Sequence, residues 1–384
     1  MLLDNDNKND KKITKIVITG GPCAGKTTAM SWITNTFTKQ GYAVLVIPET
    51  ATSLITSGVA PWTCENSVEY QRVQMFLQKS KEKAYEYAAN HNKEDKVLIV
   101  CDRGIPDNSA YMGKDEYEMI LKEMGTNAVT ERDSYDAVFH LVTAADGAEE
   151  AYTLSNNGAR TESIEEARAV DKRLMYAWTG HPHFRIIDNS TDFHEKMNKL
   201  IKEITSALGE PLPYEIERKF LIEYPDINYL ESLPNCQKVD IVQTYLLSAS
   251  GKERRVRARG QNGHYIYYLT EKEPVSTGKR IEIERKLTQE EYIKYSMEAD
   301  PNLHTIRKTR YCLSYNSIYF EIDVYPNWNK QAFVEVELHD ENEQITFPEF
   351  INVIREVTGE EIYSNHELSK NMPAEEVGKV FLKH

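Results

Sequence analysis

A Walker A loop is indicated by the stretch Gly20-Gly21-Pro22-Cys23-Ala24-Gly25-Lys26-Thr27-Thr28. Four residues separate Gly20 from Gly25, which is followed by a lysine and a residue with a hydroxyl group. Glycines let the backbone curl until successive N–H groups point inward around phosphate oxygens. The lysine reaches the outer phosphates, and the hydroxyl holds Mg²⁺. The sequence therefore predicts a nucleotide-binding loop with Thr27 as a metal ligand.

The residues on either side of this loop support the prediction. Lys15–Thr19 is a short apolar run that predicts a buried strand, and Lys26–Gln40 carries apolar residues at helical spacing until Gly41 ends the pattern. A helix that begins at the loop points its positive N-terminal end at bound phosphates. The alternative is a glycine-rich turn with a chance lysine, which the order strand, loop, helix disfavours.

Length and composition limit the class of protein. A chain of 384 residues is long enough for two or three domains. Its 60 acidic and 46 basic residues give a net charge of −14, so we expect no nucleic acid among its partners. The five cysteines lie far apart without a C-x-x-C pair, which indicates a reducing compartment and disfavours a zinc site or a disulfide framework.

The sequence also predicts a cytoplasmic location. It has no run of about 18 apolar residues that could span a bilayer. Residues 1–12 alternate acids, amides and lysines, which is typical of a disordered tail and not of a signal peptide. The oligomeric state is not indicated.

Two acidic residues follow predicted strands at the edge of the sheet where the loop lies. Tyr42–Ile47 predicts a second strand just before Glu49, and Val97–Cys101 predicts a third just before Asp102. Asp102 suits a Walker B role in orienting Mg²⁺, with Arg103 in reach of phosphate. Glu49 is a candidate general base for a substrate hydroxyl or an outer-sphere metal ligand. A helix cap and a surface turn are the structural alternatives.

The remaining patterns of the first half complete an α/β unit. Ser67–Ala89 predicts a long helix with Val73, Phe76 and Leu77 among its inward positions. Two more strands and a closing helix are predicted at Ala137–Val142, Phe184–Asp188 and Asp192–Leu208. We therefore predict a P-loop NTPase domain over residues 13–208, with helices on both faces of a parallel sheet.

A polar segment between these strands predicts a lid over the phosphates. Asp146–Ala167 contains Arg160 and is followed by Arg168, and phosphoryl-transfer proteins often close an arginine-bearing segment over the nucleotide. A plain solvated loop is the alternative. Asn189, just after the last predicted strand, is a candidate reader of the nucleotide base.

This half resembles the P-loop kinases of the nucleoside-kinase type, in particular the AAA-like ATPase/kinase family that is attached to CYTH domains. The resemblance rests on the Walker loop, Pro48-Glu49-Thr50, Asp102-Arg103-Gly104 and the closing stretch from His181 to Asn189. It implies ATP or GTP as the ligand. No N-K-x-D guanine motif follows a predicted strand, so the choice between the two stays open.

The second half begins after a two-proline joint at residues 209–213, which cannot extend the preceding helix. From Tyr214 to the end, at residue 384, charged residues fall on alternate positions, as strands require. The repeating sets are Glu215, Glu217 and Lys219; Arg255, Arg257 and Arg259; Glu282, Glu284 and Lys286; Lys308 and Arg310; Glu321 and Asp323; and Glu335 and Glu337.

The sign of these charges differs from strand to strand, which is unlike the mixed signs of an ordinary surface. If such a sheet closes with these faces inward, burying either sign alone is very costly. A metal–polyphosphate complex would balance both, because carboxylates hold divalent metal and cations hold phosphate oxygens. The alternative is an antiparallel sandwich with a salt-bridged outer face.

Glu215-Ile216-Glu217-Arg218-Lys219 is similar to the E-x-E-x-K signature of CYTH proteins, the triphosphate tunnel metalloenzymes. The resemblance implies an α+β domain with an eight-stranded antiparallel tunnel that hydrolyses triphosphates with Mg²⁺ or Mn²⁺. It implies metal ligands at Glu215, Glu217, Glu335 and Glu337, and acids that place metal or water at Glu282, Glu284 and Asp323. It implies phosphate-binding cations at Lys219, Arg255, Arg257, Lys272, Lys308 and Arg310, with Arg307 and Lys308 as an alternative for the last pair.

Three functions follow from these patterns. The first is a metal-dependent phosphohydrolase that acts on inorganic tripolyphosphate or a nucleoside triphosphate, with a P-loop half that binds ATP or GTP. The second is a regulatory switch, implied by resemblance to tandem proteins of the TRPL translocation defect family, whose tunnel binds a phosphoinositide headgroup at a membrane surface without turnover. The third is a small-molecule kinase with Glu49 as base. We prefer the first.

Overall fold

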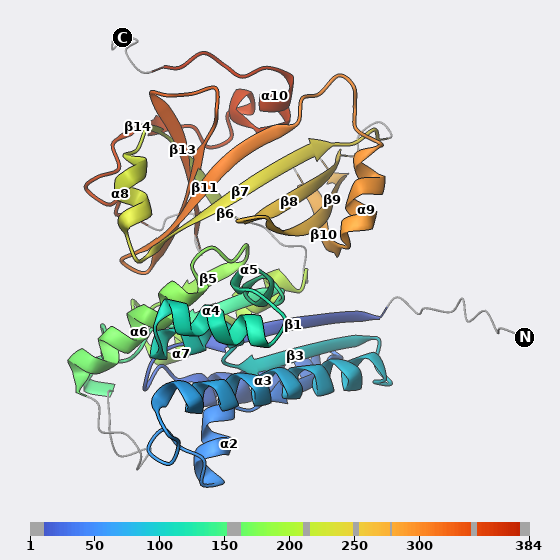
Figure 1. Ribbon diagram of the computed structural model, residues 1–384. Helices are drawn as coiled ribbons and strands as arrows, with labels where there is room; N and C mark the ends of the chain where they lie inside the picture. Colours follow the sequence, from blue (N-terminus) through green and yellow to red (C-terminus); the bar gives the residue numbers. More distant parts are fainter. Residues whose placement is uncertain are drawn as a thin grey trace, which may run out of the picture. The chain divides into compact units, whose positions relative to one another are not determined.

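The computed structural model describes residues 11–151, 163–209, 216–248, 253–276, 279–338 and 344–376. Arg160 and Glu215 lie outside these ranges, and the side chains of Lys272 and Glu282 are also outside what is described. The chain divides into two compact units, residues 1–208 and 209–384 (Figure 1). No helix among the described residues is long and apolar enough to cross a bilayer.

The first unit is built on a parallel five-stranded sheet in the order β2-β3-β1-β4-β5. Its strands are β1 (Lys12–Thr19), β2 (Ala43–Ile47), β3 (Lys96–Asp102), β4 (Ala137–Leu141) and β5 (Phe184–Ile187). Every neighbouring pair is parallel. The central strand β1 begins inside the predicted tail and ends at the Walker loop. Because β3 is its direct neighbour, Asp102 emerges beside that loop.

Helices cover both faces of this sheet, as the sequence predicts. They are α1 (Lys26–Lys39), α2 (Thr50–Thr56), α3 (Ser67–Asn90), η1 (Ile105–Tyr111), α4 (Lys114–Glu123), α5 (Ala128–Arg132), η2 (Glu149–Ala151), α6 (Ile164–Trp178) and α7 (Phe193–Ala207). One core joins α1 and α7 to β1, β3 and β4, with Ile33 and Leu200 fully buried in it. A second core joins α3 and α4 through Met75 and Ile120.

The predicted inward positions of α3 are wrong for Val73 and Phe76, which are 43% and 44% exposed, whereas Leu77 is partly buried. The buried residues of α3 include polar ones, among them Gln74 and Gln78. Gln74 Nε2 donates to Asn108 Oδ1 at 2.9 Å, and Gln78 Nε2 donates to the Arg103 carbonyl at 3.2 Å. Hydrogen bonds of this kind let amides be buried at little cost, which an apolar pattern cannot anticipate.

The second unit contains an antiparallel nine-stranded sheet in the order β10-β9-β8-β7-β11-β12-β13-β6-β14. Its strands are β6 (Ile216–Glu223), β7 (Cys236–Tyr245), β8 (Glu253–Gln261), β9 (His264–Ser276), β10 (Lys279–Leu287), β11 (Ile306–Tyr315), β12 (Ile318–Val324), β13 (Gln331–Leu338) and β14 (Val353–Glu356). Short helices accompany them: α8 (Ile227–Ser232), α9 (Gln289–Ser296), η3 (Glu361–Tyr363) and α10 (Asn365–Lys370). The sheet is consistent with a CYTH tunnel barrel, and the short strand β14 adds a ninth strand to the predicted eight.

The two faces of this sheet differ in chemistry. Phe320, Ile322 and Val334 pack on one face, where Phe347 and Phe350 cover them. Residues that pair directly across antiparallel strands share a face, and the register pairs Lys219 with Glu335. The charged residues therefore lie together on the other face, which we call the inner face.

Candidate nucleotide and phosphate sites

The Walker loop has the curled backbone that its glycines predict. Gly20, Cys23 and Gly25 have positive φ angles of 139°, 55° and 92°. A Cβ atom at Gly20 would lie 2.1 Å from the Leu141 carbonyl oxygen, so only glycine fits there. Lys26 Nζ donates to the Gly20 and Gly21 carbonyls at 3.1 and 3.4 Å. The lysine thus lies over the loop at the N-terminus of α1, where phosphate oxygens would compete for its protons.

A buried aspartate on α6 holds this loop, and sequence reasoning missed it. Asp171 Oδ1 accepts the Gly21 N–H at 2.6 Å and lies 3.2 Å from His140 Nε2. Burial alone would raise the pKa of Asp171, but the His140 imidazole and the Gly21 amide lower it overall. Thr143 Oγ1 also donates to the Pro22 carbonyl. Asp171 belongs to no local motif, so only the tertiary contact identifies it.

Glu49 and Arg103 form an ion pair beside the loop. Arg103 Nε lies 2.7 Å from Glu49 Oε1, and Arg103 has a positive φ of 72°. Burial would raise the pKa of Glu49, but Arg103 and Lys26 outweigh it and lower the pKa to about 2. A carboxylate with so low a pKa is a weak base at neutral pH. Glu49 therefore suits the positioning of Arg103 better than proton abstraction.

Asp102 has the chemistry that a divalent cation requires. Burial raises its pKa, and its Oδ1 atom is buried without a hydrogen-bond partner among the described residues. A buried carboxylate oxygen without a partner is unfavourable unless a cation or water satisfies it. Together with the hydroxyl of Thr27, this oxygen fits the oxygen ligands that Mg²⁺ prefers.

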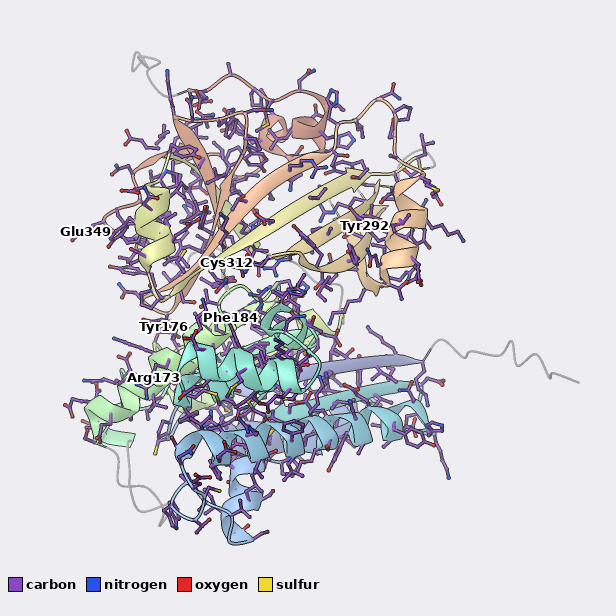
Figure 2. The ribbon with its side chains drawn as sticks, in the orientation of Figure 1. Arg173, Tyr176, Phe184, Tyr292, Cys312 and Glu349 are labelled. Carbon is purple, nitrogen blue, oxygen red and sulfur yellow. The ribbon has the colours of Figure 1, made fainter. Side chains whose placement is uncertain are left out.

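The other predicted residues of the nucleotide site have partners within the protein. Asn189 Nδ2 donates to the Thr143 and Asp146 carbonyls at 2.8 and 2.6 Å, which ties it to the segment after β4. Arg168 Nη2 lies 2.6 Å from Glu149. Arg173, which lies on the same helix as Arg168 and was not a predicted site residue, donates to the Ala110 carbonyl at 2.9 Å (Figure 2 labels it). The roles of Asn189 and Arg160 in nucleotide binding stay predictions.

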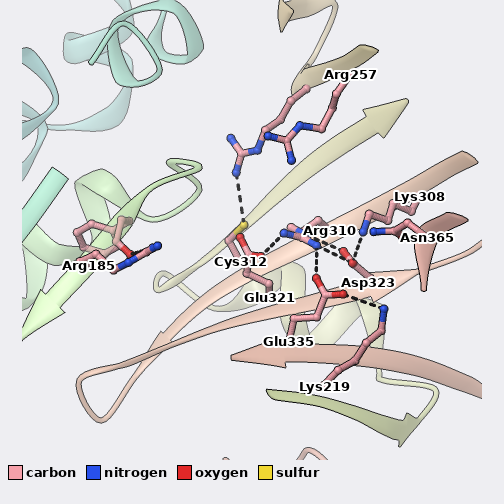
Figure 3. A network of polar contacts seen from close by, with 12 residues as sticks. Arg185, Lys219, Arg257, Lys308, Arg310, Cys312, Glu321, Asp323, Glu335 and Asn365 are labelled. Atoms are coloured by element: carbon pink, nitrogen blue, oxygen red, sulfur yellow. Dashed lines mark hydrogen bonds and ion pairs between the residues drawn. The ribbon is translucent and has the colours of Figure 1, made fainter. Parts of the chain in front are cut away.

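The inner face of the second unit holds a buried network of ion pairs centred on Arg310 (Figure 3). Arg310 donates to both oxygens of Asp323 at 2.7 Å and to Glu335 Oε2 at 2.6 Å. It also contacts Glu321. On either side, Lys308 contacts Asp323 and Lys219 lies 2.9 Å from Glu335. The network thus brings together predicted site residues from the four strands β6, β11, β12 and β13. Glu321 on β12 also belongs to the network, although it was not a predicted site residue.

The electrostatics of this network follow from burial and opposite charge. Burial lowers the pKa of Lys308, although Asp323 offsets part of that effect. Burial would raise the pKa of Glu335, but Lys219, Lys308 and Arg310 outweigh it and hold the pKa well below its usual value. Three cations face three carboxylates here, so the network compensates its own charge.

Three arginines lie on the β8 side of this network, and a glutamate of β10 lies beside them. On the β8 side, Arg255, Arg257 and Arg259 share the inner face, and Arg257 Nη2 lies 2.7 Å from Glu284. Thr270 Oγ1 donates to the same carboxylate at 3.1 Å. Glu282 and Lys272 pair on β10 and β9, but their side chains lie outside those described.

Glutamates gather on β6 and β13. Glu217 pairs directly with Glu337 and lies diagonally from Glu335. Repulsion from Glu335, with desolvation second, raises the pKa of Glu217 to about 8. Because the Glu217 side chain is exposed, we take repulsion to be the decisive cause. Crowded carboxylates of this kind fit a hard divalent cation such as Mg²⁺ or Mn²⁺.

The donor set for a metal is incomplete among the described residues. They contain no group of three or more His, Cys, Asp or Glu residues arranged to hold a metal ion. Glu335 is already paired with Lys219 and Arg310, and Glu215 lies outside the described ranges. The carboxylate oxygens of Glu217 and Glu337 fit a divalent metal ion. The assignment of the metal ligands stays a prediction.

The fold and these sites define a protein with a P-loop nucleotide-binding unit and a separate unit whose antiparallel sheet is lined with charge. Comparison with family models agrees: the AAA domain model matches residues 15–196, and the CYTH domain model matches residues 213–363. The chain therefore carries an AAA-type P-loop domain followed by a CYTH domain. Comparison with the curated proteins finds no match.

Several solved structures are similar to parts of the chain. The inorganic triphosphatase NE1496 is 25% identical over 42% of this chain and 99% of its own, with a TM-score of 0.30. The protein PH1819 from Pyrococcus horikoshii is 21% identical over 32% of this chain and 77% of its own, with a TM-score of 0.25. Thymidylate kinase from Candida albicans is 16% identical over 51% of this chain and 94% of its own, with a TM-score of 0.39.

Proposed function

We propose that the protein is a metal-dependent phosphohydrolase that cleaves inorganic tripolyphosphate or a nucleoside triphosphate on the inner face of its CYTH domain. The P-loop domain binds ATP or GTP. The observation that carries the proposal is that arginines gather on β8 and that glutamates gather apart from them on β6 and β13.

This separation suits a phosphate chain with a metal ion. The arginines of β8 pair across to uncharged residues on β7, namely Ile241, Gln243 and Tyr245, and Arg257 also pairs with Glu284. Phosphate oxygens accept hydrogen bonds from arginine forks. The glutamates on the other side would hold the cation. Phosphoryl transfer needs mainly such positioning and fixed charge, because little covalent chemistry falls to the protein.

The residues of the inner face would act in three ways. Arg255 and Arg257 would hold and orient the phosphate chain, and Lys308 and Lys219 would exchange part of their pairing with Asp323 and Glu335 for phosphate oxygens. Glu217 and Glu337 are the described residues that would hold the metal. A bound divalent cation supplies charge neutralisation and a more acidic water.

The test is release of phosphate from tripolyphosphate by the full chain with Mg²⁺ or Mn²⁺. We expect Glu217→Gln combined with Glu337→Gln to lower kcat/KM at least about a hundredfold, because carboxylate ligands are lost. Glu223→Gln on the same strand β6 is the control. Unchanged activity of the double variant would overturn the assignment, and tight binding of a phosphoinositide headgroup without turnover would favour the regulatory function instead.

A second candidate function is favoured by one observation in the first unit. Tyr70 Oη, Gln71 Oε1 and Gln74 Oε1 are buried on α3 without hydrogen-bond partners among the described residues. Tyr70 lies close enough to Glu49 for that carboxylate to raise its pKa further, after burial. Buried polar atoms without hydrogen-bond partners favour the binding of a second polar ligand beside the P-loop. That ligand would be the acceptor of a small-molecule kinase.

The kinase candidate predicts phosphoryl transfer from ATP to a hydroxyl group of a small molecule. The protein would be incubated with ATP, Mg²⁺ and a panel of nucleosides, and the products would be separated by mass. A phosphorylated product that Lys26→Ala abolishes would support the candidate. If ATP is hydrolysed at the same rate with and without every acceptor, the candidate is wrong.

A further inference from the structure

The turn after β3 carries two neighbouring side chains of opposite charge. Asp102 ends β3, and Arg103 follows it with a left-handed backbone, at a φ of 72°. Asp102 Oδ1 and Arg103 Nη1 are both buried without a hydrogen-bond partner among the described residues. Successive side chains of a strand point to opposite faces of the sheet, and a left-handed residue ends that alternation. The turn thus offers an acceptor for a metal ion next to a donor for a phosphate oxygen.

The surroundings of this turn hold its backbone. A left-handed conformation is unfavourable for a residue other than glycine, so it persists only where neighbouring groups impose it. The Arg103 N–H donates to the Ile18 carbonyl at 3.1 Å, and the Arg103 carbonyl accepts the Gln78 amide. At the next residue, Gly104, a Cβ atom would lie 2.6 Å from the Trp178 ring. The turn is therefore packed between β1, α3 and α6.

Asp107 in η1 is the side chain on which these contacts meet. It is 2% exposed, and both of its carboxylate oxygens are engaged. Its Oδ2 accepts the Gly104 N–H at 2.7 Å, and its Oδ1 accepts the Trp178 Nε1–H at 3.0 Å. The Thr19 hydroxyl also donates to Oδ1. One carboxylate thus joins the turn, the helix α6 and the last residue of β1.

The contact with Thr19 links the turn to the Walker loop. Thr19 is fully buried and directly precedes Gly20, the first residue of that loop. The register of the sheet pairs Ile18 with Asp102 on the neighbouring strand β3. Asp107 therefore fixes the end of β1 relative to the end of β3, and these are the strand ends from which the Walker loop and Asp102 emerge.

We propose that Asp107 is a positioning residue of the nucleotide site. It holds the turn so that Asp102 receives Mg²⁺ and Arg103 receives a phosphate oxygen, and it acts only through these two residues. This rests on the proposed binding of ATP or GTP by the P-loop domain. No sequence pattern indicates this role, because the three groups that contact Asp107 come from β1, the turn and α6.

Asparagine cannot replace Asp107, although it has nearly the same shape. A carboxylate accepts hydrogen bonds on both oxygens, whereas an amide has one oxygen and one NH₂ group. If the amide oxygen faces the Gly104 N–H, the NH₂ group meets the Trp178 Nε1–H, and in the other orientation it meets the Gly104 N–H. Two donors that face each other leave a buried polar group unpaired. Asp107→Asn should therefore loosen the turn without a change in volume.

The test compares nucleotide binding with and without Mg²⁺. The full chain is titrated in a calorimeter with ATP, and separately with GTP, first in Mg²⁺ and then in EDTA. Only binding that Lys26→Ala abolishes is counted, which excludes binding to the second unit. We call the Kd in EDTA divided by the Kd in Mg²⁺ the magnesium ratio. We expect Asp107→Asn to lower this ratio at least about tenfold, because residues that orient metal ligands have effects of this size.

A second measurement shows whether Asp107 acts through Asp102. Asp102→Asn alone should lower the magnesium ratio at least as much as Asp107→Asn does. In a chain that already carries Asp102→Asn, the further substitution Asp107→Asn should change the ratio by less than about twofold, because effects of residues that act through one another do not add. Additive effects of the two substitutions would contradict the proposed role.

The control is another buried aspartate of the first unit. Asp133 is fully buried and accepts the Arg132 Nε–H at 2.6 Å. It precedes β4, whereas the Walker loop follows the end of the parallel strand β1. Asp133→Asn should lower Tm but leave the magnesium ratio unchanged. A loss of stability alone therefore does not produce the expected result.

Thr19→Val removes one donor to Asp107 and keeps a residue that suits a strand. It should lower the magnesium ratio roughly threefold, as the loss of one hydrogen bond would. If Asp107→Asn does not fold, this variant decides. An unchanged ratio in the folded variants would overturn the proposal.

The inference and the proposed function fail in different ways. If no binding of ATP or GTP depends on Lys26, the nucleotide site of the proposed function is wrong, and the role of Asp107 is wrong with it. If nucleotide binds and Asp102→Asn lowers the magnesium ratio but Asp107→Asn does not, the nucleotide site is supported and the role of Asp107 is wrong.

Discussion

Glu217 carries a pH signature that a single substitution can test. Its pKa rises from 4.5 to about 8 because Glu335 repels its charge. Between these two pH values the folded protein binds more protons at this site than the unfolded chain does. Stability therefore falls as the pH rises through this window. We expect the fall in Tm from pH 4.5 to pH 8 to be smaller in Glu217→Gln, measured by thermal unfolding.

Glu223→Gln, on the same strand, should leave the pH dependence of Tm as in the wild type. If Glu217→Gln and the wild type lose the same Tm over the window, repulsion between the two glutamates does not operate. Added Mg²⁺ should raise Tm most at the upper end of the window, where Glu217 is ionised and can hold the cation.

Arg310 is the residue on which the buried charge network depends. It is 9% exposed and contacts three carboxylates, those of Glu321, Asp323 and Glu335. Removal of the guanidinium would leave buried carboxylates without their common partner. We expect Arg310→Ala to lower the free energy of unfolding of the second unit by roughly 3–5 kcal/mol in urea.

The control for this substitution is a surface pair in the same sheet. Arg218 lies 2.6 Å from Glu356, and both side chains are partly exposed. Arg218→Ala should cost at most about 1 kcal/mol, because water replaces the lost partner and salt screens the pair. Equal losses from the two substitutions would contradict the view that burial makes the Arg310 network costly to break.

At the scale of elements, the Walker loop depends on close packing against α6. A Cβ atom at Gly21 would lie 2.7 Å from Asp171 Oδ1 and 2.9 Å from Asp171 Cβ. Gly21→Ala must therefore push the loop and the helix apart. We expect a loss of about 1–3 kcal/mol in the free energy of unfolding, from overpacking, and weaker nucleotide binding by calorimetry.

Gly113→Ala is the matched control for Gly21→Ala. A Cβ atom at Gly113 would meet only the flexible end of the Glu116 side chain, at 3.1 Å. Its φ of −70° is open to any residue. The control should therefore be close to neutral. If Gly21→Ala is also neutral in stability and in nucleotide affinity, the contact between α6 and the loop does not constrain the site.

At the scale of the whole molecule, each unit has its own core, and we propose that each has its own ligand. Ile33 lies in a core of the first unit, and Phe320 lies in a core of the second. We predict two thermal transitions in a calorimeter. ATP or GTP with Mg²⁺ should raise one transition, and tripolyphosphate should raise the other in a Lys26→Ala chain, because a ligand stabilises only the unit that binds it. A single transition raised equally by both ligands would contradict this.

Much of the P-loop half is readable in the sequence because its chemistry is local. The conformation of the Walker loop depends on residues that are neighbours in the chain. An apolar run such as Val97–Cys101 indicates a strand that helices cover on both sides. The same reasoning fails for α3, where Gln74 and Gln78 are buried and Val73 is not. The burial of Gln74 and Gln78 depends on Asn108 in η1 and on the Arg103 carbonyl just after β3, which lie far from α3 in the sequence.

The alternation of charge in the second half predicts strands, and it also predicts that Lys308 and Arg310 share one face of their strand, as Glu321 and Asp323 do on theirs. The period of two residues fixes which side chains share a face, without any tertiary information. Which carboxylate pairs with which cation depends on strand order, because β11, β12, β13 and β6 are adjacent in the sheet. The contact of Asp171 with Gly21 likewise joins residues that only the packing of α6 brings together.

Local spacing and period were sufficient to predict a phosphate loop, alternating strands and helices in the first half, and strands with charge on one face in the second, since each depends on residues close together in the chain. The partners of buried charges were decided by the tertiary structure. The energy of a buried charge depends on groups that lie within a few ångströms in space, and in this protein those groups come from separate strands.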